Sequence, residues 1–401
     1  MAERLHVAIA GAGIGGLCLA QGLRKEGICV SVYEREASVR SRGQGYRFRI
    51  DSQGDSALRR CLPSRFYDLY RATANRPSKP PAAAFNHRLE LIYRMPNTPG
   101  AAPLSDHLAV NRLTLRQVLL GGLTDCVYFS HEAAYVEPYG TDIRVSFSNG
   151  QSAVAHVLVA ADGIHSSVRR QLLPQAEIAD LGMQCIYGKT PLNEEILSWL
   201  PEPLFSGFTP VLGPHRRTLA LGIYRSRQPF REALAEVGLD VKLDPVPDYL
   251  MWMLVFPAES LPATGSDSSR LHQSTLQMTE DWHPDVRRIL QLAEVSSTFS
   301  VAIRSARHPE PWRVSNITFI GDAIHAMTPA GGVGANTALR DAALLTDLLA
   351  AVSRGELGVD DALAHYESEM RHYAFAAVQQ SLQAAAHLYQ IPASNLEGVP
   401  C

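Results

Sequence analysis

The sequence has no excess of charge of either sign and no long hydrophobic run. Its 401 residues include 37 Lys and Arg against 40 Asp and Glu, which gives a formal net charge of −3. This balance creates no field that would attract a polyanion, so a nucleic-acid partner is not expected. The longest apolar run, residues 249–256, is far shorter than the ~20 residues that span a bilayer, so no membrane association is expected either.

Cysteine is scarce and shows no ligand spacing. The six cysteines form no CxxC pair, and Cys18 and Cys29 fall within expected core elements. We therefore expect reduced, structural thiols and no metal site. Because the chain opens directly on a nucleotide-binding strand, no room remains for a signal peptide, and we expect a cytoplasmic protein. The six positions are Cys18, Cys29, Cys61, Cys126, Cys185 and Cys401.

Three glycine-rich motifs lie far apart along the chain, at residues 11–16, 161–163 and 321–334. Each follows a short apolar run that is typical of a buried strand. In open α/β sheets, ligands bind at the carboxyl ends of the strands. The sequence therefore predicts that the three motifs meet around one ligand.

The first motif has the features of a dinucleotide-binding turn. Gly11 permits the tight turn, Gly13 lets the backbone approach a pyrophosphate, and Gly16 lets the following helix pack closely. Glu34 ends the next expected strand, 18 residues beyond Gly16, where an acid accepts hydrogen bonds from an adenosine ribose. An acid at this position disfavours a phosphorylated ribose, so the bound cofactor is predicted to be FAD or NAD rather than NADP.

Arginines follow this first unit. They are either part of a solvated loop or neutralise the cofactor phosphates, and we favour the phosphate role for Arg47 and Arg49. Arg112 begins an expected helix at residues 113–123, where it can hold a phosphate or simply the helix entry. The basic stretch comprises Arg35, Arg40, Arg42, Arg47 and Arg49.

The composition, 46% hydrophobic and 19% charged residues, is that of a globular protein with two or three domains. The expected fold class is α/β. A Rossmann-type FAD-binding domain carries an inserted β-meander, with alternating segments around Val127, Val136, Val145 and Val154. A smaller substrate domain has a largely antiparallel sheet, and helices follow at the C-terminus.

The predicted domain boundaries are discontinuous. The FAD-binding domain takes residues 1–75, 105–180 and 301–350. The substrate domain takes residues 76–104 and 181–300, with expected strands at 183–189, 218–224 and 249–256. Residues 351–401 form a C-terminal segment, with several helices expected from residue 359 to about 389.

The motifs together resemble the single-component FAD-dependent monooxygenases of the p-hydroxybenzoate hydroxylase type. Residues 158–169 are similar to the aspartate-glycine motif of that family, and residues 321–336 to its second FAD motif. The resemblance extends from residue 5 to about residue 350. It implies that Asp322 accepts hydrogen bonds from the ribityl hydroxyls, and that residues 329–334 pass beside the isoalloxazine ring.

The resemblance also implies the remaining cofactor contacts. The positive end of the helix after Gly334 would stabilise the anionic reduced flavin, whereas His165 and His325 are expected to be structural. No metal ligand is expected. The full set of expected cofactor-binding residues is Gly11, Gly13, Gly16, Glu34, Arg35, Arg47, Arg112, Asp162, Asp322, Pro329, Gly332, Gly334 and Ala335.

The chemistry implied by the resemblance is oxygen insertion. NADH or NADPH reduces FAD, O2 adds to the reduced flavin, and a 4a-hydroperoxide passes one oxygen atom to the substrate, by hydroxylation or epoxidation, in a site that must exclude water. Alternation along residues 183–189 places Met183, Cys185 and Tyr187 on one face. Tyr187 and Tyr224 are candidate catalytic residues that could help to deprotonate a phenol, although each is equally consistent with a packed tyrosine.

The substrate is expected to be a hydrophobic aromatic or polycyclic small molecule, and the protein a monomer or homodimer. Relatives that resemble salicylate hydroxylase carry an arginine near the position of residues 186–188, which disfavours a small carboxylate here. The alternatives are a flavin-dependent reductase and a flavin-binding protein that sequesters a labile intermediate. A flavin halogenase is disfavoured because its Trp-x-Trp-x-Ile-Pro motif is absent.

Overall fold

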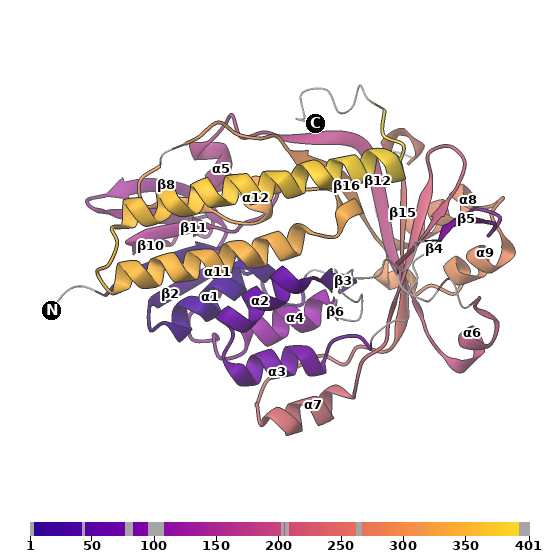
Figure 1. The fold of residues 1–401 in the computed structure, drawn as a ribbon, viewed down its shortest axis with the longest axis horizontal. Helices are drawn as coiled ribbons and strands as arrows, with labels where there is room; N and C mark the ends of the chain where they lie inside the picture. The colour runs from indigo at the N-terminus through magenta and orange to yellow at the C-terminus, as the bar shows by residue number, and fades with distance from the viewer. Residues whose placement is uncertain are drawn as a thin grey trace.

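The computed structural model describes residues 4–41, 45–76, 83–94, 108–201, 204, 208–261, 267–312 and 314–392. A nucleotide-binding part occupies the left of Figure 1 and a large twisted sheet the right. One long C-terminal helix runs across both. The site predicted from the sequence lies where these two parts meet.

A five-stranded parallel sheet forms the centre of the nucleotide-binding part. Its strand order is β17 (Ile317–Phe319), β11 (Val157–Ala160), β1 (His6–Ala10), β2 (Cys29–Glu34) and β7 (Val127–Phe129). Strands β1, β11 and β17 are almost wholly buried, as expected for a parallel sheet covered by helices, whereas the edge strand β7 is partly exposed. All three glycine motifs therefore follow neighbouring strands, β1, β11 and β17, as the sequence predicts.

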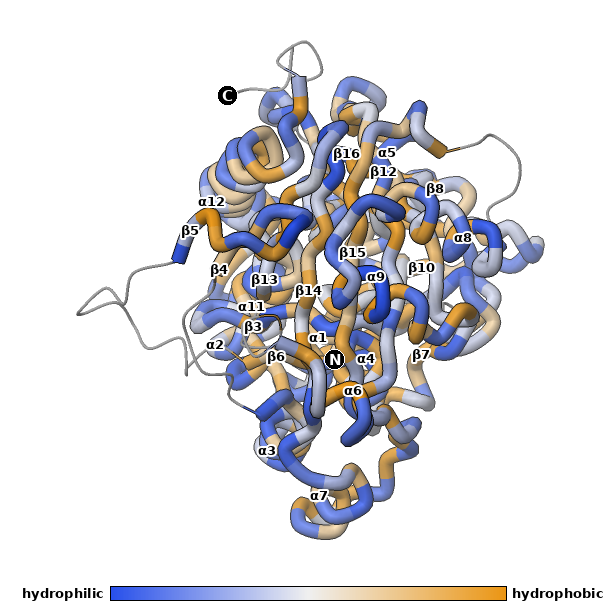
Figure 2. The backbone as a smooth tube through the Cα atoms, turned by 90° about the vertical axis from the view of Figure 1, so that its right-hand side faces the viewer, coloured by the Kyte–Doolittle hydropathy of each residue, from blue (hydrophilic) through white to orange (hydrophobic). Residues whose placement is uncertain are grey.

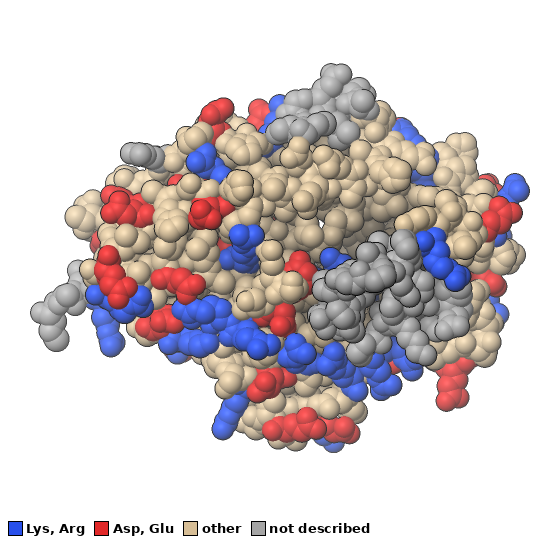
Figure 3. All heavy atoms as spheres, in the orientation of Figure 1, with Lys and Arg blue, Asp and Glu red and all other residues tan. Residues whose placement is uncertain are grey.

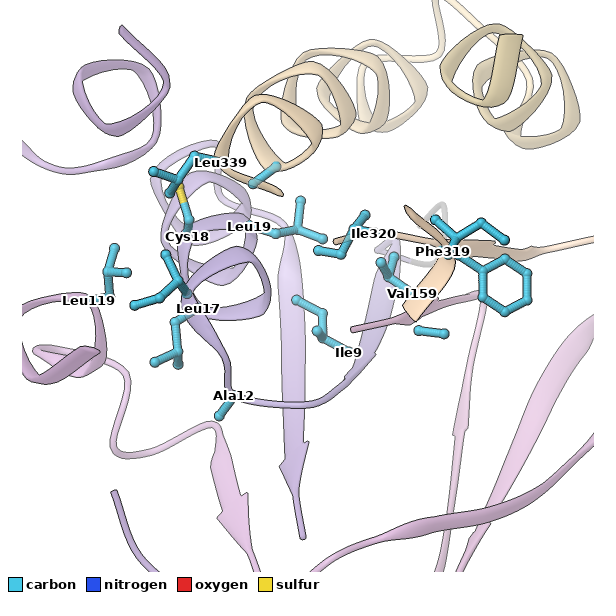
Figure 4. Packing of buried hydrophobic residues seen from close by; sticks show 14 of the residues in the cluster. Ile9, Ala12, Leu17, Cys18, Leu19, Leu119, Val159, Phe319, Ile320 and Leu339 are labelled. Atoms are coloured by element: carbon cyan, nitrogen blue, oxygen red, sulfur yellow. The ribbon is translucent and has the colours of Figure 1, made fainter. Parts of the chain in front are cut away.

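Helices α1 (Ile14–Lys25) and α11 (Gly334–Ser353) pack together against this sheet. Figure 4 shows Leu19 of α1 next to Ile320, on the side of the helix that faces Ile9 and Val159, whereas Leu17 lies toward Leu119. Both helices begin at glycine motifs, so the core packing fixes where those motifs lie.

The inserted meander contains three strands rather than four. β8 (Ala133–Tyr139), β9 (Asp142–Phe147) and β10 (Ser152–Ala155) form an antiparallel sheet. The segment around Val127, expected in the meander, instead pairs in parallel with β2. Its short apolar run fits either sheet, and only the tertiary pairing decides between them.

Short helices complete the nucleotide-binding part, and side chains cap several of them. Asp51 accepts from Gly54 N, Asn111 from Leu113 N and Ser166 from Arg169 N. Strands β3 (Arg47–Ile50) and β6 (Leu108–Asn111) form a separate antiparallel ribbon. The helices are α2 (Ser52–Cys61), α3 (Ser64–Ala72), α4 (Arg112–Leu120), α5 (Ser167–Leu172) and α10 (Asp322–His325).

The second part is built on a seven-stranded, mainly antiparallel sheet, here called the large sheet. Only β13 and β4 pair in parallel. Figure 2 shows the hydrophobic strands β14 and β15 near its centre. The strand order is β16 (Phe299–Ala306), β12 (Ile178–Pro191), β15 (Tyr249–Pro257), β14 (Thr218–Tyr224), β13 (Phe208–Leu212), β4 (Ala83–Asn86) and β5 (Leu91–Arg94).

The two faces of the large sheet belong to different cores. Ile186 and Trp252 pack in a separate cluster with α8 (Ser268–Met278) and α9 (Pro284–Gln291). Met183, Cys185 and Tyr187 pack in the cluster that includes the nucleotide-binding part. The predicted alternation along this strand is therefore confirmed, and its odd-numbered residues face the site. Two further helices, α6 (Glu194–Trp199) and α7 (Phe230–Val237), follow β12 and β14 in the chain.

The C-terminal segment forms one helix, α12 (Val359–Leu388), rather than the several helices expected. It packs along α11 and reaches the turn at residues 329–331. The Tyr366 hydroxyl donates to Phe319 O at 2.9 Å, which ties the helix to β17. None of the helices in the described ranges is long and apolar enough to cross a membrane.

Cysteine environments differ from expectation at one position. Cys18 and Cys61 are buried, but Cys29 is exposed at the start of β2. The five cysteines in the described ranges are free thiols, and Cys401 lies outside those ranges. Cys29 is the first residue of β2 and lies at the edge of the core, so its side chain stays accessible although most of the following residues are buried.

Charges of both signs are interspersed on the surface shown in Figure 3. On α2, Arg60 lies 2.8 Å from Glu26 and 2.7 Å from Asp347. Arg60 is thus neutralised locally, and such exposed pairs add little to stability.

Glu367 on α12 makes stability depend on pH. Burial raises the pKa of Glu367 to about 7, whereas an unfolded glutamate titrates near ~4.3. Between these values the folded protein binds the proton that the unfolded chain releases, so stability falls as pH rises through this window.

Glu367→Gln should therefore remove a destabilisation of about 3 kcal/mol at pH 8 and raise Tm there, but remove only about 1 kcal/mol at pH 5. Thermal unfolding at both pH values measures this. Glu369→Gln, at an exposed position of the same helix, is the control. An unchanged pH dependence in Glu367→Gln would contradict the assignment.

Candidate functional site

Close backbone contacts bring the three glycine motifs together. A Cβ atom at Gly11 would overlap Ala161 O, so the first turn lies directly on the second motif. The Arg169 guanidinium donates to Ala323 O at 2.8 Å, which joins the second motif to the third. A Cβ atom at Gly15 or at Gly321 would lie 3.2 Å from Cβ of Ala338 on α11.

In the first turn, a side chain at Gly11 or Gly16 would collide with protein atoms, whereas a side chain at Gly13 would enter open space. Gly11 has a φ of +113°, and a Cβ atom at Gly16 would overlap Gly11 O. A Cβ atom at Gly13 would have no heavy atom within 4 Å. Gly13 therefore marks the side of the turn that a ligand can approach, at the N-terminus of α1.

Glu34 is held rigidly beside this turn. Its carboxylate accepts from Ala12 N and Glu36 N, each at 3.0 Å, and from the Arg116 guanidinium at 2.9 Å. Arg116 also donates to Ala12 O at 2.7 Å. Glu34 Oε1 accepts only the bond from Glu36 among these contacts, so it keeps capacity to accept from a ribose hydroxyl.

Sequence reasoning missed Arg116. The side chain is buried one turn after Arg112 on α4 and forms an ion pair with Glu34 in which both side chains are 7% exposed. A buried arginine requires such a partner. The only indication of a buried role for Arg116 in the sequence was that it lies on the apolar face of an expected helix.

Asp162 of the second motif has one satisfied and one free oxygen. Oδ2 accepts from Ser167 N at 3.0 Å, whereas the buried Oδ1 has no hydrogen-bond partner in the structure. Burial raises the pKa of Asp162, although hydrogen bonds from the start of α5 oppose the shift. A buried acceptor without a partner fits a site that a bound group completes.

Asp322 of the third motif is the first residue of α10. Its side chain is accessible, yet desolvation by the surrounding protein raises its pKa. The nearby His325 and Arg112 partly reverse this shift. The Asp322 carboxylate is therefore accessible to a ligand and partly desolvated by the protein. Such a group can accept hydrogen bonds from ligand hydroxyls, which is the role that the sequence predicts toward the ribityl chain.

A buried network that the sequence did not reveal holds the third motif. Asp341 on α11 accepts from Gly321 N at 2.9 Å, from His325 Nε2 at 2.6 Å and from the Tyr373 hydroxyl at 2.6 Å. Burial lowers the pKa of His325, but the Asp341 carboxylate more than reverses this and raises it. This pairing gives His325 a positioning role, in line with the expectation from the sequence.

The loop that contains Pro329, Gly332, Gly334 and Ala335 is anchored on both sides. The Thr328 hydroxyl donates to Ser381 O on α12 at 2.9 Å. Asn336 accepts from Asp51 N at 3.0 Å and donates to Arg49 O at 2.9 Å. Gly332 has a φ of +61°, and α11 begins at Gly334. The turn and the helix N-terminus are thus fixed beside β3.

The expected arginines occupy different places. Arg112 N donates to Tyr46 O at 2.9 Å, and its guanidinium lies 6.0 Å from the Tyr46 ring. Arg35 lies 3.6 Å from Glu36. Arg47 contacts the large sheet at Gly222 rather than the first turn. The cofactor roles of these arginines stay predictions.

The two candidate catalytic tyrosines have different surroundings. The buried Tyr224 hydroxyl donates to Thr73 O at 2.9 Å, so a structural role accounts for it. The Tyr187 ring stacks on Tyr46 at 5.0 Å and on Phe299 at 5.2 Å. Burial raises the pKa of Tyr187 well above its usual range, so its hydroxyl stays protonated. Catalysis by either residue remains a prediction.

Comparisons with known proteins decide the family. The family model described as an FAD binding domain matches residues 124–381, and an NAD(P)-binding Rossmann-like domain matches residues 9–61. A solved protein from Photorhabdus luminescens, assigned as an FAD containing monooxygenase, is 31% identical, with a TM-score of 0.82 over 96% of this chain and 99% of that one. The chain belongs to the FAD-dependent monooxygenases of the p-hydroxybenzoate hydroxylase type.

Fungal relatives of this chain differ in length. The dual O-methyltransferase/FAD-dependent monooxygenase CTB3 of Cercospora beticola is 32% identical over 404 residues, which cover 92% of this chain but 44% of that protein. The FAD-dependent monooxygenase thnD of Trichoderma harzianum is 27% identical, with 94% and 92% covered. The chain thus spans less than half of the first relative.

The chain binds FAD, and its residues fit that cofactor. Gly13 leaves open space at a helix N-terminus, Glu34 and Asp162 each keep an acceptor, and the Asp322 side chain is accessible. Gly13, Asp162 and Asp322 lie on the three motifs, and Glu34 is joined to the first motif by the hydrogen bond from Ala12 N.

Asp322→Ala should purify largely colourless. Loss of the carboxylate removes charge-assisted hydrogen bonds to the ribityl chain, which should weaken FAD binding by roughly 100-fold. The ratio of flavin to protein absorbance measures this. Asp360→Ala, at an exposed site on α12, should stay yellow, and full flavin content in Asp322→Ala would show that its assignment is wrong.

Gly13→Ala should separate folding from cofactor binding. The added methyl group meets no protein atom, so apoprotein Tm should be unchanged or slightly higher, while FAD affinity falls at least roughly tenfold because the methyl group blocks the pyrophosphate. In Gly16→Ala the added methyl group overlaps Gly11 O, so this variant should lower both the apoprotein Tm and the FAD affinity. Calorimetry and flavin titration distinguish them, and wild-type FAD affinity in Gly13→Ala would contradict this placement.

Proposed function

We propose that the protein uses NADH or NADPH and O2 to insert one oxygen atom into a largely apolar aromatic or polycyclic small molecule, by hydroxylation or epoxidation. The observation that carries this proposal is the position of the second and third motifs beside β16 of the large sheet, where Arg304 lies 3.3 Å from His165 and Ala306 N donates to Ala326 O at 2.7 Å. β16 pairs with β12, the strand that bears Cys185 and Tyr187. A redox cofactor held there would lie next to an apolar surface.

FAD, when bound, supplies the redox chemistry, accepting a hydride from reduced nicotinamide and activating O2. The protein's own contribution is to position the cofactor and to limit water around the reacting atoms, since water would divert reduced oxygen species to hydrogen peroxide. Asp322 and Glu34 orient the cofactor through its hydroxyl groups. The N-terminus of α11 favours negative charge beside it.

The face of the large sheet that is turned to the motifs suits an aromatic substrate. Its side chains include Met251 and Met253 of β15, which are 4% and 2% exposed. Flexible thioethers adapt to flat ring systems. The stacked rings of Tyr46, Tyr187 and Phe299 adjoin the same face and favour a planar ligand.

Oxygen consumption provides the test. In the presence of NADH or NADPH, a panel of polycyclic phenols should include compounds that accelerate O2 uptake and yield products heavier by one oxygen atom. With 18O2 the added atom should be labelled, and with H2 18O it should not. Reduced product without O2 uptake would indicate a reductase, and unaltered ligand with no nicotinamide oxidation would indicate a sequestering flavoprotein.

A further inference from the structure

Two cationic side chains lie between the β3–β6 ribbon and the large sheet. Arg47 extends from β3 to β14, where a Cβ atom at Gly222 would lie 2.6 Å from its Nη1. Lys189 belongs to β12, on the same face as Tyr187, and its Nζ would lie 3.4 Å from a Cβ atom at Gly45. The two cations therefore reach the same region from opposite walls.

The aromatic ring of Tyr249 links these cations. Lys189 Nζ lies 4.9 Å from its centroid, and the charge of Arg47 acts on its hydroxyl. That hydroxyl accepts from Asn111 Nδ2 at 3.1 Å, and Asn111 is the cross-strand partner of Arg47. The cluster of Arg47, Lys189, Asn111 and Tyr249 is called the cationic cluster below.

The cationic cluster contains no counter-ion within the described ranges. Arg47 and Lys189 form no salt bridge there, and Arg47 Nε is buried without a hydrogen-bond partner. Burial raises the pKa of Tyr249, so its hydroxyl is neutral. Among the described residues, Glu294 is the acid whose charge raises the pKa of Lys189; its side chain is exposed and accepts from the Ser296 hydroxyl at 3.0 Å.

Desolvation makes this arrangement costly. Burial lowers the pKa of both Arg47 and Lys189, which shows that their charged forms lose solvation without full compensation. Buried charges are usually paired. Arg47 and Lys189 are two such charges, and they converge beside stacked aromatic rings. An anion is needed to complete this site.

We infer that Arg47 and Lys189 hold an anionic oxygen of the aromatic substrate, either a phenolate or a ring carboxylate. This inference rests on the proposed function and specifies its substrate class. The sequence has an uncharged segment at residues 186–188, where relatives that resemble salicylate hydroxylase carry an arginine, and this disfavoured a small carboxylate as the substrate. In the folded protein, Lys189 and the distant Arg47 supply positive charge at this face instead.

Equilibrium binding to the oxidised holoenzyme tests the inference without turnover. The probes are 2-naphthoate and its neutral isostere 2-naphthamide, together with 2-naphthol and neutral 2-methoxynaphthalene. Perturbation of the flavin absorbance gives each Kd, and released FAD gives the cofactor content. The naphthoate and naphthol arms distinguish a carboxylate from a phenolate.

Wild-type protein should bind at least one acidic probe about tenfold more tightly than its neutral partner. Arg47→Met and Lys189→Met should each weaken that acidic probe roughly 10- to 100-fold, with the neutral probes and FAD content unchanged. Arg231→Met, at an exposed site on α7, is the matched control and should behave as wild type.

Several results would overturn the inference. They are no preference of the wild type for an acidic probe, equal losses for acidic and neutral probes, or loss of FAD in Arg47→Met, which would place Arg47 with the cofactor phosphates. Because no nicotinamide or O2 uptake is involved, failure here leaves the oxygen-insertion proposal intact. Conversely, acid-selective binding without any oxygenation would refute only that proposal.

Discussion

The contact of the Gly11 turn with the Ala161 carbonyl is the constraint on which the rest of the site depends. No side chain fits between them, so β1 and β11 end at the same level and their turns share one edge of the sheet. Ala338 then brings α11 against both Gly15 and Gly321. Close backbone packing, rather than side-chain chemistry, therefore creates the concave edge that receives a dinucleotide.

Polar networks behind this edge fix the ligand-facing groups. Arg116 neutralises and orients Glu34, and Asp341 collects Gly321 N, His325 and Tyr373. Such buried charges are tolerated because each is paired and hydrogen-bonded. Within the described ranges the cationic cluster has no such counter-ion, and this contrast is the reason for proposing that it holds a ligand group rather than a structural ion pair.

The helix α12 connects the chemistry to the fold as a whole. It runs along α11 and holds the loop at residues 329–331 through Thr328 and Ser381. The predicted boundary at residue 350 separated this helix from the FAD-binding domain. In three dimensions α12 covers that domain and reaches the large sheet, where Thr218 Oγ1 donates to Leu388 O at 2.9 Å.

The sequence by itself determined the family, the parallel sheet with its three glycine turns, and the alternation that turns Tyr187 toward the site. These features depend on local geometry, because in each motif a strand is followed at a fixed spacing by a glycine. Such a short-range pattern can be read directly from the order of residues. Only the tertiary structure decided that residues 127–129 join the parallel sheet, that Arg116 and Asp341 hold the motifs, and that Arg47 faces Lys189. These pairings join residues from 16 to more than 140 positions apart. Their energies come from burial and from partners that no local pattern encodes.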